Sequence, residues 1–145
     1  MQEQSFFMIK PDGVRRGLED DVLGYLRDAN LETIKKKSFL MTAEDAEKLY
    51  AVHREKPFYK GLVNFITSGP VVAMVVEGEE CIPRLREIMG ATDPAKALSG
   101  TIRGDLKEKD YFTKDGTMKN IVHGSDSPEN AKYEMAIFFD EGGAV

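Results

Sequence analysis

The chain is poor in the residues on which disulfide-bonded and zinc-binding proteins depend. It has one cysteine, two histidines and no tryptophan among 145 residues. The single thiol, Cys81, can form no internal disulfide, so the sequence favours a reducing compartment and a structural role for this residue on the apolar side of a helix. Two histidines without cysteine partners at ligand spacing are a poor zinc set, and a structural zinc ion is disfavoured.

Long apolar runs and an excess of basic charge are also missing. The first apolar run, residues 5–9, ends at Lys10 and Pro11 and is too short for a signal peptide or a membrane-spanning helix. The net charge of -5 and the pI near 5.1 disfavour a protein that works by binding nucleic acid or membranes. We therefore expect a soluble, cytoplasmic protein with neither kind of partner.

The composition fits a single domain that spans residues 1–145. Hydrophobic residues make up 41% of the chain, enough for one sizeable core. Apolar periodicity predicts strands over 5–9, 31–41, 71–76 and 135–139, and helices over 18–29, 43–53, 58–66 and 82–89, with a short helix from Ser127. This order predicts an α+β fold of the ferredoxin-like, split βαβ type, in which helices pack on a four-stranded antiparallel sheet.

Two segments stand apart from this pattern. Residues 92–119 have no sustained period, which is typical of a functional loop region, and Asp115-Gly116 within them indicates a hairpin turn. Lysines 35–37 lie in the second predicted strand, where a solvated edge strand protected from pairing is favoured over a nucleic-acid patch shared with Arg15 and Arg16.

The segment 120–127 carries the leading candidate for a nucleophile, His123. A glycine, two hydroxyls and a carboxylate follow this imidazole, just ahead of the helix predicted from Ser127. An unprotonated imidazole can attack phosphorus when one ring nitrogen keeps its lone pair and an acceptor holds the other. Glu134 and Asp126 are the candidate acceptors. Glu134 is preferred because the helix predicted from Ser127 can place its side chain beneath the loop that carries His123.

Phosphate binding would need fixed positive charge from side chains. The candidates are Lys10, Arg86 and Arg103, each of which lies at or beside a predicted element or its boundary. From there their side chains can converge over strand ends. Taken singly, each is more simply interpreted as a solvated surface residue. The sequence has no GxxxxGK[ST] element and no GxGxxG after a strand, so neither a Walker-type loop nor a dinucleotide-binding turn is expected.

Six motifs occur in register along the chain. They are residues 10–14 with Arg16 and Gly17, 56–59 with 61–63, 68–74, 89–94, 100–105 and 120–127. Any one of them is a weak signal, because Asp12-Gly13 alone predicts only a turn. Together they give the chain a resemblance to the nucleoside diphosphate kinase family, which runs from about residue 5 to residue 139 in the family's order.

The resemblance implies a ping-pong reaction with His123 as the phosphoryl carrier. The histidine would take the γ-phosphoryl group from a nucleoside triphosphate and pass it to a different nucleoside diphosphate. By similarity, Nδ1 of His123 attacks, Glu134 holds the other ring nitrogen, Ser125 supports the loop and Tyr50 stands beside the histidine.

The resemblance also implies how the nucleotide and its metal are held. Mg²⁺ would arrive on the nucleotide phosphates with no direct protein ligand, and Asp126 would touch it at most through water. A ring that only stacks on the base predicts a broad base range. The implied nucleotide contacts are Arg86, Thr92 and Arg103 on phosphates, Lys10 and Asn120 on the ribose hydroxyls and the transferring group, and Phe58 on the base.

Two expectations concern assembly and a departure from the family pattern. The resemblance implies a homo-oligomer, a hexamer, tetramer or dimer, built from dimers joined edge to edge, and residues 141–145 are expected to form a frayed end. The connection from Arg103 to Asn120 is longer than the family's, which places an aliphatic residue against the far side of the base. A hairpin at the nucleotide mouth and a solvent-exposed loop without effect on the nucleotide are both open.

Other functions for the same fold are disfavoured or untouched by the sequence. A regulatory nucleotide-binding protein that has lost turnover would be signalled by loss of His123 or of the cations, and all of these are present. A phosphorelay protein, whose phosphohistidine serves another protein, is neither supported nor opposed.

Overall fold

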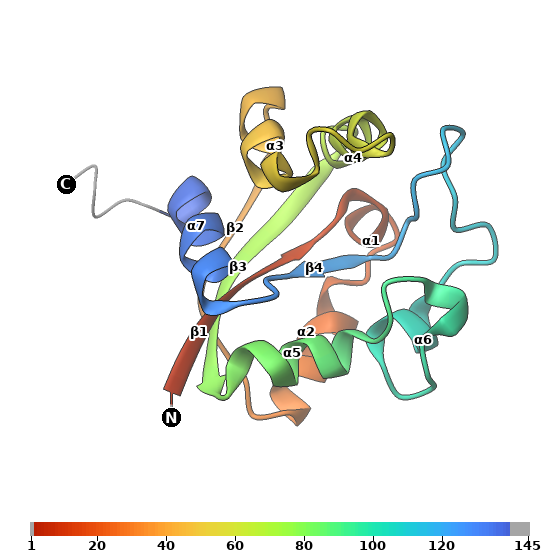
Figure 1. The fold of residues 1–145 in the computed structure, drawn as a ribbon. Helices are drawn as coiled ribbons and strands as arrows, with labels where there is room; N and C mark the ends of the chain where they lie inside the picture. The colour runs from red at the N-terminus through yellow and green to blue at the C-terminus, as the bar shows by residue number, and fades with distance from the viewer. Residues whose placement is uncertain (1, 140–145) are drawn as a thin grey trace.

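A four-stranded sheet lies between two layers of helices in the computed structural model, which describes residues 2–139 (Figure 1). Neighbouring strands are all antiparallel, and their order is β2-β3-β1-β4. The predicted ferredoxin-like α+β fold is therefore confirmed. The strands are β1 (Gln2–Ile9), β2 (Glu32–Leu40), β3 (Pro70–Glu79) and β4 (Val122–Gly124). The helices are α1 (Pro11–Arg15), α2 (Glu19–Asp28), α3 (Ala43–Leu49), α4 (Tyr59–Ile66), α5 (Cys81–Met89), α6 (Ile102–Leu106) and α7 (Pro128–Phe139), with 3-10 turns η1 (Ala51–His53) and η2 (Pro94–Lys96).

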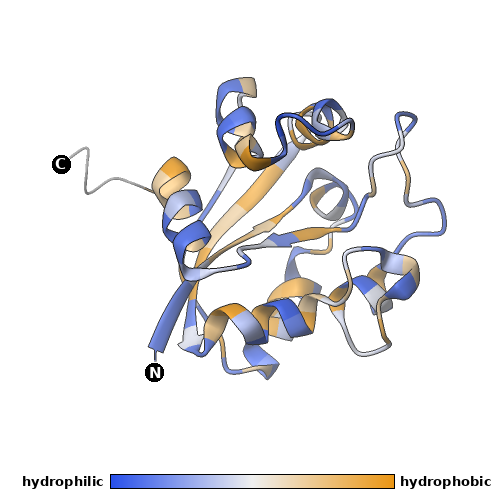
Figure 2. Ribbon diagram, viewed as in Figure 1, coloured by the Kyte–Doolittle hydropathy of each residue, from blue (hydrophilic) through white to orange (hydrophobic). Residues whose placement is uncertain are grey.

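The central strands contribute side chains to two hydrophobic cores, one on each face of the sheet. In β1, Phe6 and Met8 pack with side chains of α3, α4 and α7, whereas Phe7 and Ile9 pack with α2, α5 and α6. In Figure 2, β3 is coloured as hydrophobic over much of its length. Because both faces are covered, the apolar run of residues 71–76 is continuous rather than alternating.

Cys81 belongs to the core on the α5 side, as the sequence predicts. The residue is fully buried at the start of α5, and burial raises the pKa of its thiol to about 11. A protonated, inaccessible thiol has little nucleophilic character, which fits a structural role.

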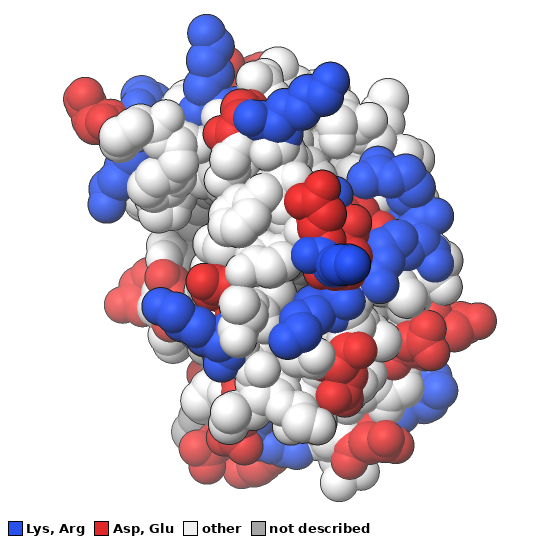
Figure 3. Space-filling model, turned by 90° about the vertical axis from the view of Figure 1, so that its right-hand side faces the viewer, with Lys and Arg blue, Asp and Glu red and all other residues white. Residues whose placement is uncertain are grey.

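The lysine run lies on β2, which is the edge strand expected from the sequence. Lys36 pairs with Glu19 at 2.6 Å, and the Lys37 ammonium lies 5.0 Å from the ring centroid of Phe139. These contacts hold two of the three lysines against the protein's own side chains. Figure 3 shows another face, on which Lys and Arg side chains gather on the right of the view with Asp and Glu side chains beside them.

The prediction of a strand over residues 135–139 is wrong, because these residues form the last part of α7. Ser127 caps the helix by accepting the Asn130 N–H at 3.1 Å, and Glu134 and Phe138 are buried four residues apart on one side. A short apolar run suits a strand or a buried helix equally well. The fourth strand is instead β4, three residues centred on His123.

Several short elements lie where the sequence predicts turns, loops or one continuous helix. Pro11 begins helix α1 at the predicted turn, and Thr101 caps α6 inside the predicted loop by accepting the Gly104 N–H at 3.1 Å. The helix predicted over 43–53 ends at Leu49 and resumes as η1. Single helical turns leave too little periodicity for a sequence pattern to detect.

The expected hairpin is present over residues 111–119. The Thr113 N–H donates to the Thr117 carbonyl at 2.8 Å, the Lys119 N–H donates to the Tyr111 carbonyl at 2.6 Å, and a β-bridge joins the strands between them. Within residues 2–139, every helix is too short or too polar to cross a membrane.

Candidate active site

His123 is held by a buried carboxylate from the next helix. β4 pairs with β1 so that Met8 lies opposite His123. The His123 Nε2 atom lies 2.9 Å from Oε1 of Glu134, and the Ser125 hydroxyl donates to the same oxygen at 2.7 Å. A carboxylate can only accept, so this contact places the ring proton on Nε2 and leaves the lone pair on Nδ1. No described residue forms a hydrogen bond with Nδ1 of His123.

Apolar and aromatic side chains enclose this pair. The Phe6 ring centroid lies 5.9 Å from that of His123. Tyr50 is buried nearby, and burial followed by the charge of Glu134 raises the pKa of its hydroxyl well above the ordinary range. Tyr50 therefore stays neutral and can act as a hydrogen-bond donor at physiological pH.

Lys10 and Asn120 form a second group beside the histidine. Lys10 follows β1, and its ammonium donates to the Asn120 Oδ1 at 2.8 Å while the Asn120 amide donates to the Thr92 carbonyl at 3.0 Å. Burial lowers the pKa of Lys10 to about 8; the Arg103 charge adds to this effect and the Asp12 charge opposes it. A buried cation with a lowered pKa gains from an incoming anion, because the anion restores the lost solvation.

Arg103 supports the segment before the histidine. Its guanidinium donates from Nε to the Asn120 carbonyl at 3.0 Å, from NH1 to the Gly90 carbonyl at 3.0 Å and from NH2 to the Val122 carbonyl at 2.7 Å. Burial, with help from Arg86, lowers the pKa of Arg103 to about 10. The side chain thus brings fixed positive charge to the site and ties three backbone segments together.

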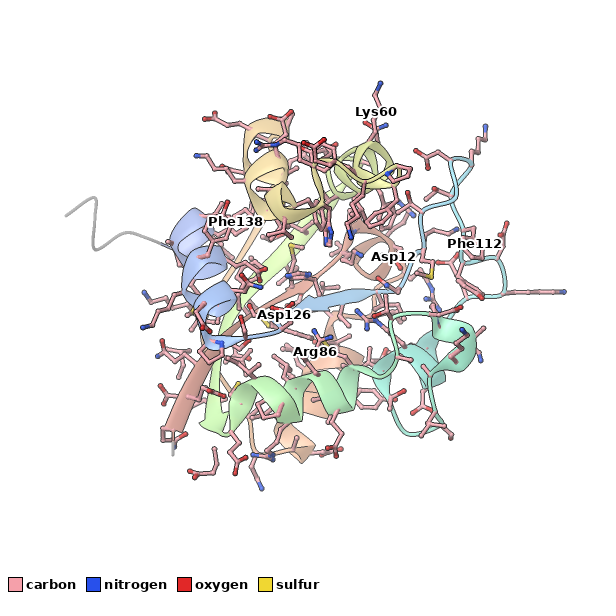
Figure 4. The ribbon with its side chains drawn as sticks, viewed as in Figure 1. Asp12, Lys60, Arg86, Phe112, Asp126 and Phe138 are labelled. Carbon is pink, nitrogen blue, oxygen red and sulfur yellow. The ribbon has the colours of Figure 1, made fainter. Side chains whose placement is uncertain are left out.

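A cavity of about 610 Å³ unites these groups. Figure 4 shows Arg86 and Asp126 beside β4 on its open edge. Of the predicted site residues, only Ser125 is absent from the lining, since it lies buried behind His123. The predicted residues in the lining are Lys10, Tyr50, Phe58, Arg86, Thr92, Arg103, Asn120, His123, Asp126 and Glu134.

The cavity has little to offer a metal ion on its own. The described residues include no group of three or more His, Cys, Asp or Glu side chains placed to hold a metal. Glu134 is engaged by His123 and Ser125, which leaves Asp126 as the other lining carboxylate. Its hydrogen bond from Asn130 lowers the pKa of Asp126, with further help from Arg86, so the carboxylate is ionised.

Comparison with known proteins assigns the chain to a family. The family model "Nucleoside diphosphate kinase" matches residues 3–143. The chain belongs to the nucleoside diphosphate kinase family. It is 48% identical over 143 residues to the nucleoside diphosphate kinase of Dehalococcoides mccartyi strain 195, across 99% of this chain and 96% of that protein. It is 50% identical over 139 residues to that of Archaeoglobus fulgidus, across 96% and 87% of the two chains.

Solved structures of nucleoside diphosphate kinases have the same fold. A halophilic nucleoside diphosphate kinase from Halobacterium salinarum, solved in complex with CDP, is 43% identical and superposes with a TM-score of 0.87 over 97% of this chain and 89% of the other. The Aquifex aeolicus enzyme superposes with a TM-score of 0.85 at 39% identity, over 96% of each chain. As a nucleoside diphosphate kinase, the chain is a phosphotransferase that acts on nucleotides.

Sequence reasoning missed one residue that lines the cavity of this nucleoside diphosphate kinase and one that lies outside the lining. His53 lies 5.3 Å from Phe58, ring to ring, and was interpreted only as part of a helix face. Asp12 was interpreted as a turn residue but is fully buried beside the segment that carries His123. The motif that contains Asp12 was a signal for its importance, and no comparable signal singled out His53.

The hairpin of residues 111–119 also reaches the cavity. Three hairpin residues line the mouth of the cavity: Gly116, Thr117 and Met118. Phe58, which also lines the cavity, directly precedes α4. The hairpin rests directly on α4, because a Cβ atom on Gly61 would meet the Thr117 hydroxyl. The lengthened segment is thus part of the cavity wall, and its effect on the nucleotide stays a prediction.

Proposed function

We propose that His123 carries the phosphoryl group in the transfer between nucleotides that defines this family. One observation supports the proposal above all: Nε2 is tied to Glu134, while Nδ1 has no partner among the described residues and its ring lines the cavity. The Nδ1 lone pair would attack the γ-phosphorus, forming an N–P bond as the bond to the β-phosphate oxygen breaks and the diphosphate leaves. Glu134 would offset the positive charge that the ring gains.

We propose that the same groups serve both half-reactions. After the first diphosphate leaves, a β-phosphate oxygen of the second diphosphate would attack the phosphoryl group and release the histidine nitrogen. Arg86, Thr92 and Arg103 would bind phosphates, and Lys10 and Asn120 would hold the ribose hydroxyls and the transferring group. Phosphoryl transfer needs positioning and charge neutralisation more than proton transfer, which suits this set of side chains.

The base would lie at the mouth of the cavity. Phe58 is 49% exposed, which leaves a ring face free for stacking, and the hairpin supplies Thr117 and Met118 as a second wall. Stacking tolerates every base, since each has a π-face. We therefore propose a broad base range.

We propose that Mg²⁺ reaches the site on the nucleotide. One ionised lining carboxylate fits contact with a hydrated ion better than a cage of protein ligands, because Mg²⁺ keeps several waters and prefers phosphate oxygens. Asp126 would hold a magnesium-bound water, and the ion would neutralise charge on the transferring phosphates.

We also propose that residues 1–145 act as one domain within a cytoplasmic homo-oligomer. Membership of the nucleoside diphosphate kinase family supports the homo-oligomer. The buried, single cysteine suits a reducing compartment. Light scattering after size-exclusion chromatography measures the assembly, and a monomer at micromolar concentration would contradict it.

A labelling experiment tests the proposed carrier. Purified protein mixed with γ-labelled ATP should become phosphorylated with an acid-labile label that GDP discharges. His123→Ala should abolish the label, and His53→Ala, which removes the chain's other histidine, should retain it. Glu134→Gln should slow labelling about 10-fold, because an amide keeps the hydrogen bond but cannot offset the ring's charge. Label that persists in a folded His123→Ala protein would disprove the assignment.

A further inference from the structure

The residue two positions before His123 has an unusual backbone conformation. Ile121 has a φ of 74°, and the Val122 N–H donates to the Asn120 carbonyl at 2.8 Å. These features define a γ-turn with Ile121 at its centre, a form that is rare and strained. A β-branched side chain adds to the cost at positive φ, so surrounding contacts must hold the turn in place.

Asp12 provides one of these contacts from the start of α1. Its Oδ2 atom accepts the Ile121 N–H at 3.0 Å, and the side chain is fully buried. The Lys10 N–H donates to the Ile121 carbonyl at 2.7 Å, so both polar backbone groups of Ile121 are fixed by the segment 10–12. Gly13 permits this close approach, since a Cβ there would lie 3.1 Å from Cγ2 of Ile121.

The turn sets the direction in which β4 starts and hence where the imidazole lies. Only Val122 separates Ile121 from His123, and the Nε2 contact to Glu134 depends on the position of that ring. If Ile121 relaxed to negative φ, the strand would leave the turn along another path and the contact would be lost. The Asp12 charge contributes separately, because it opposes the loss of charge on Lys10.

We propose that Asp12 is a positioning residue for phosphoryl transfer, which acts by holding the Ile121 γ-turn and so aiming His123. This inference rests on the proposed function of His123. It predicts a specific defect when Asp12 is changed: at pH 6.5, well below the pKa of about 8 for Lys10, the chemical step slows while nucleotide still binds, because the cations of the site stay in place and charged.

Three variants test the proposal by rapid-quench labelling with saturating γ-labelled ATP, alongside calorimetric measurement of ADP binding. Asp12→Ala should lower the labelling rate on the order of 10- to 100-fold, with ADP affinity changed by less than about 3-fold. Asp12→Asn keeps an oxygen that can accept the Ile121 N–H, and it should restore most of the rate. Val22→Ala is the control for lost packing, because Val22 lies on α2 in the same hydrophobic core as Ile121 and its side chain can form no hydrogen bond with the turn.

A nitrogen NMR spectrum of the imidazoles gives a readout that loss of stability would not produce. In the wild-type protein, the spectrum should show His123 as a single tautomer, with Nε2 protonated and Nδ1 unprotonated. In Asp12→Ala, it should show a mixture of the two tautomers. A wild-type labelling rate in Asp12→Ala would overturn the proposal. So would an equal slowing in Val22→Ala, or an Asp12→Asn protein as slow as Asp12→Ala, which would mean that Asp12 acts through its charge.

The same experiment separates this inference from the proposed function. If the wild-type protein takes no label, or His123→Ala keeps it, the carrier assignment fails. If the wild-type protein is labelled and Asp12→Ala is labelled equally fast, the carrier stands and only the role of Asp12 is refuted.

Discussion

The segment that carries His123 and the mouth of the same cavity are held in different ways. The inner segment, residues 120–125, accepts hydrogen bonds from Arg103 and Lys10 and donates one to Asp12, and nearly all of its residues are buried. At the mouth, Phe58 is half exposed and the hairpin 111–119 touches α4 through Thr117.

This difference follows the chemistry that each region would serve. Transfer of a phosphoryl group requires the nucleophile and the cations within a fraction of an ångström of one geometry, and a network of buried hydrogen bonds supplies that rigidity. Recognition of any base needs only a flat apolar surface. The inner segment is therefore costly to change, whereas the mouth tolerates variation.

Changing Arg103 should break the inner segment most severely. Arg103→Lys removes the three-way guanidinium contact with the Asn120, Gly90 and Val122 carbonyls, since one ammonium cannot replace it. We expect kcat/KM to fall by about 100-fold or more. Unpaired buried carbonyls should also lower the free energy of unfolding by about 3 kcal/mol. Steady-state kinetics and urea denaturation measure the two effects. An active, fully stable variant would refute the role of the three guanidinium hydrogen bonds.

Changing Phe58 should weaken nucleotide binding at the mouth of the cavity without slowing phosphoryl transfer. Phe58→Ala removes the stacking surface, and we expect about 10-fold weaker binding of ADP, GDP and CDP alike. The labelling rate at saturating ATP should stay within about 2-fold of wild type. Calorimetry and rapid-quench labelling measure these values; a loss confined to one base would show that the mouth reads base identity.

The pH dependence of nucleotide binding should reveal the buried Lys10. Its pKa is lowered to about 8, so above that pH the free protein loses the ammonium that we propose contacts the nucleotide. We expect ADP affinity to fall about 5-fold between pH 8 and pH 9. A Lys10→Met protein should bind more weakly at pH 7 and lack this fall. An unchanged wild-type affinity over the same range would contradict a titrating Lys10.

The same pKa shift predicts an effect on stability with a defined sign. Between pH 8 and the ordinary lysine value of 10.5, the unfolded chain binds the Lys10 proton more tightly than the folded one. The contribution of Lys10 to stability should therefore rise with pH in that window. Comparing urea midpoints of the wild-type and Lys10→Met proteins at several pH values isolates this contribution.

Changing Gly61 should give the smallest effect, and it tests whether the hairpin contributes to nucleotide binding at the mouth of the cavity. Gly61→Ala places a methyl group against the Thr117 hydroxyl and should lift the hairpin from α4. Helix propensity favours alanine, so stability should change little. We expect nucleotide affinity to fall about 2- to 3-fold with the labelling rate unchanged, given the modest contacts at the mouth. Unaltered affinity would assign the hairpin no part in base binding.

Sequence reasoning succeeded where residue type alone dictates the outcome. The apolar runs of β1 and β3, the helix cap at Ser127 and the choice of Glu134 over Asp126 all agree with the structure. Each depends on short-range chemistry or on helix spacing.

The errors arose where tertiary contacts decide. The run 135–139 is helical because Phe138 and Phe139 join the core above the sheet, and β4 is a strand only because β1 lies beside it. Three residues carry no period of their own. Likewise, nothing in the sequence shows that Asp12 lies beside Ile121, since 109 positions separate them.

The pairing of β1 with β4 has a consequence for biosynthesis. Met8 lies opposite His123, and Glu134 must follow before the imidazole is held, so the site draws on nearly the whole chain. Contacts this distant in sequence form slowly and late in folding. A nascent polypeptide still attached to the ribosome, with its last helix inside the exit tunnel, would have most of its sheet but no capacity to turn over nucleotides.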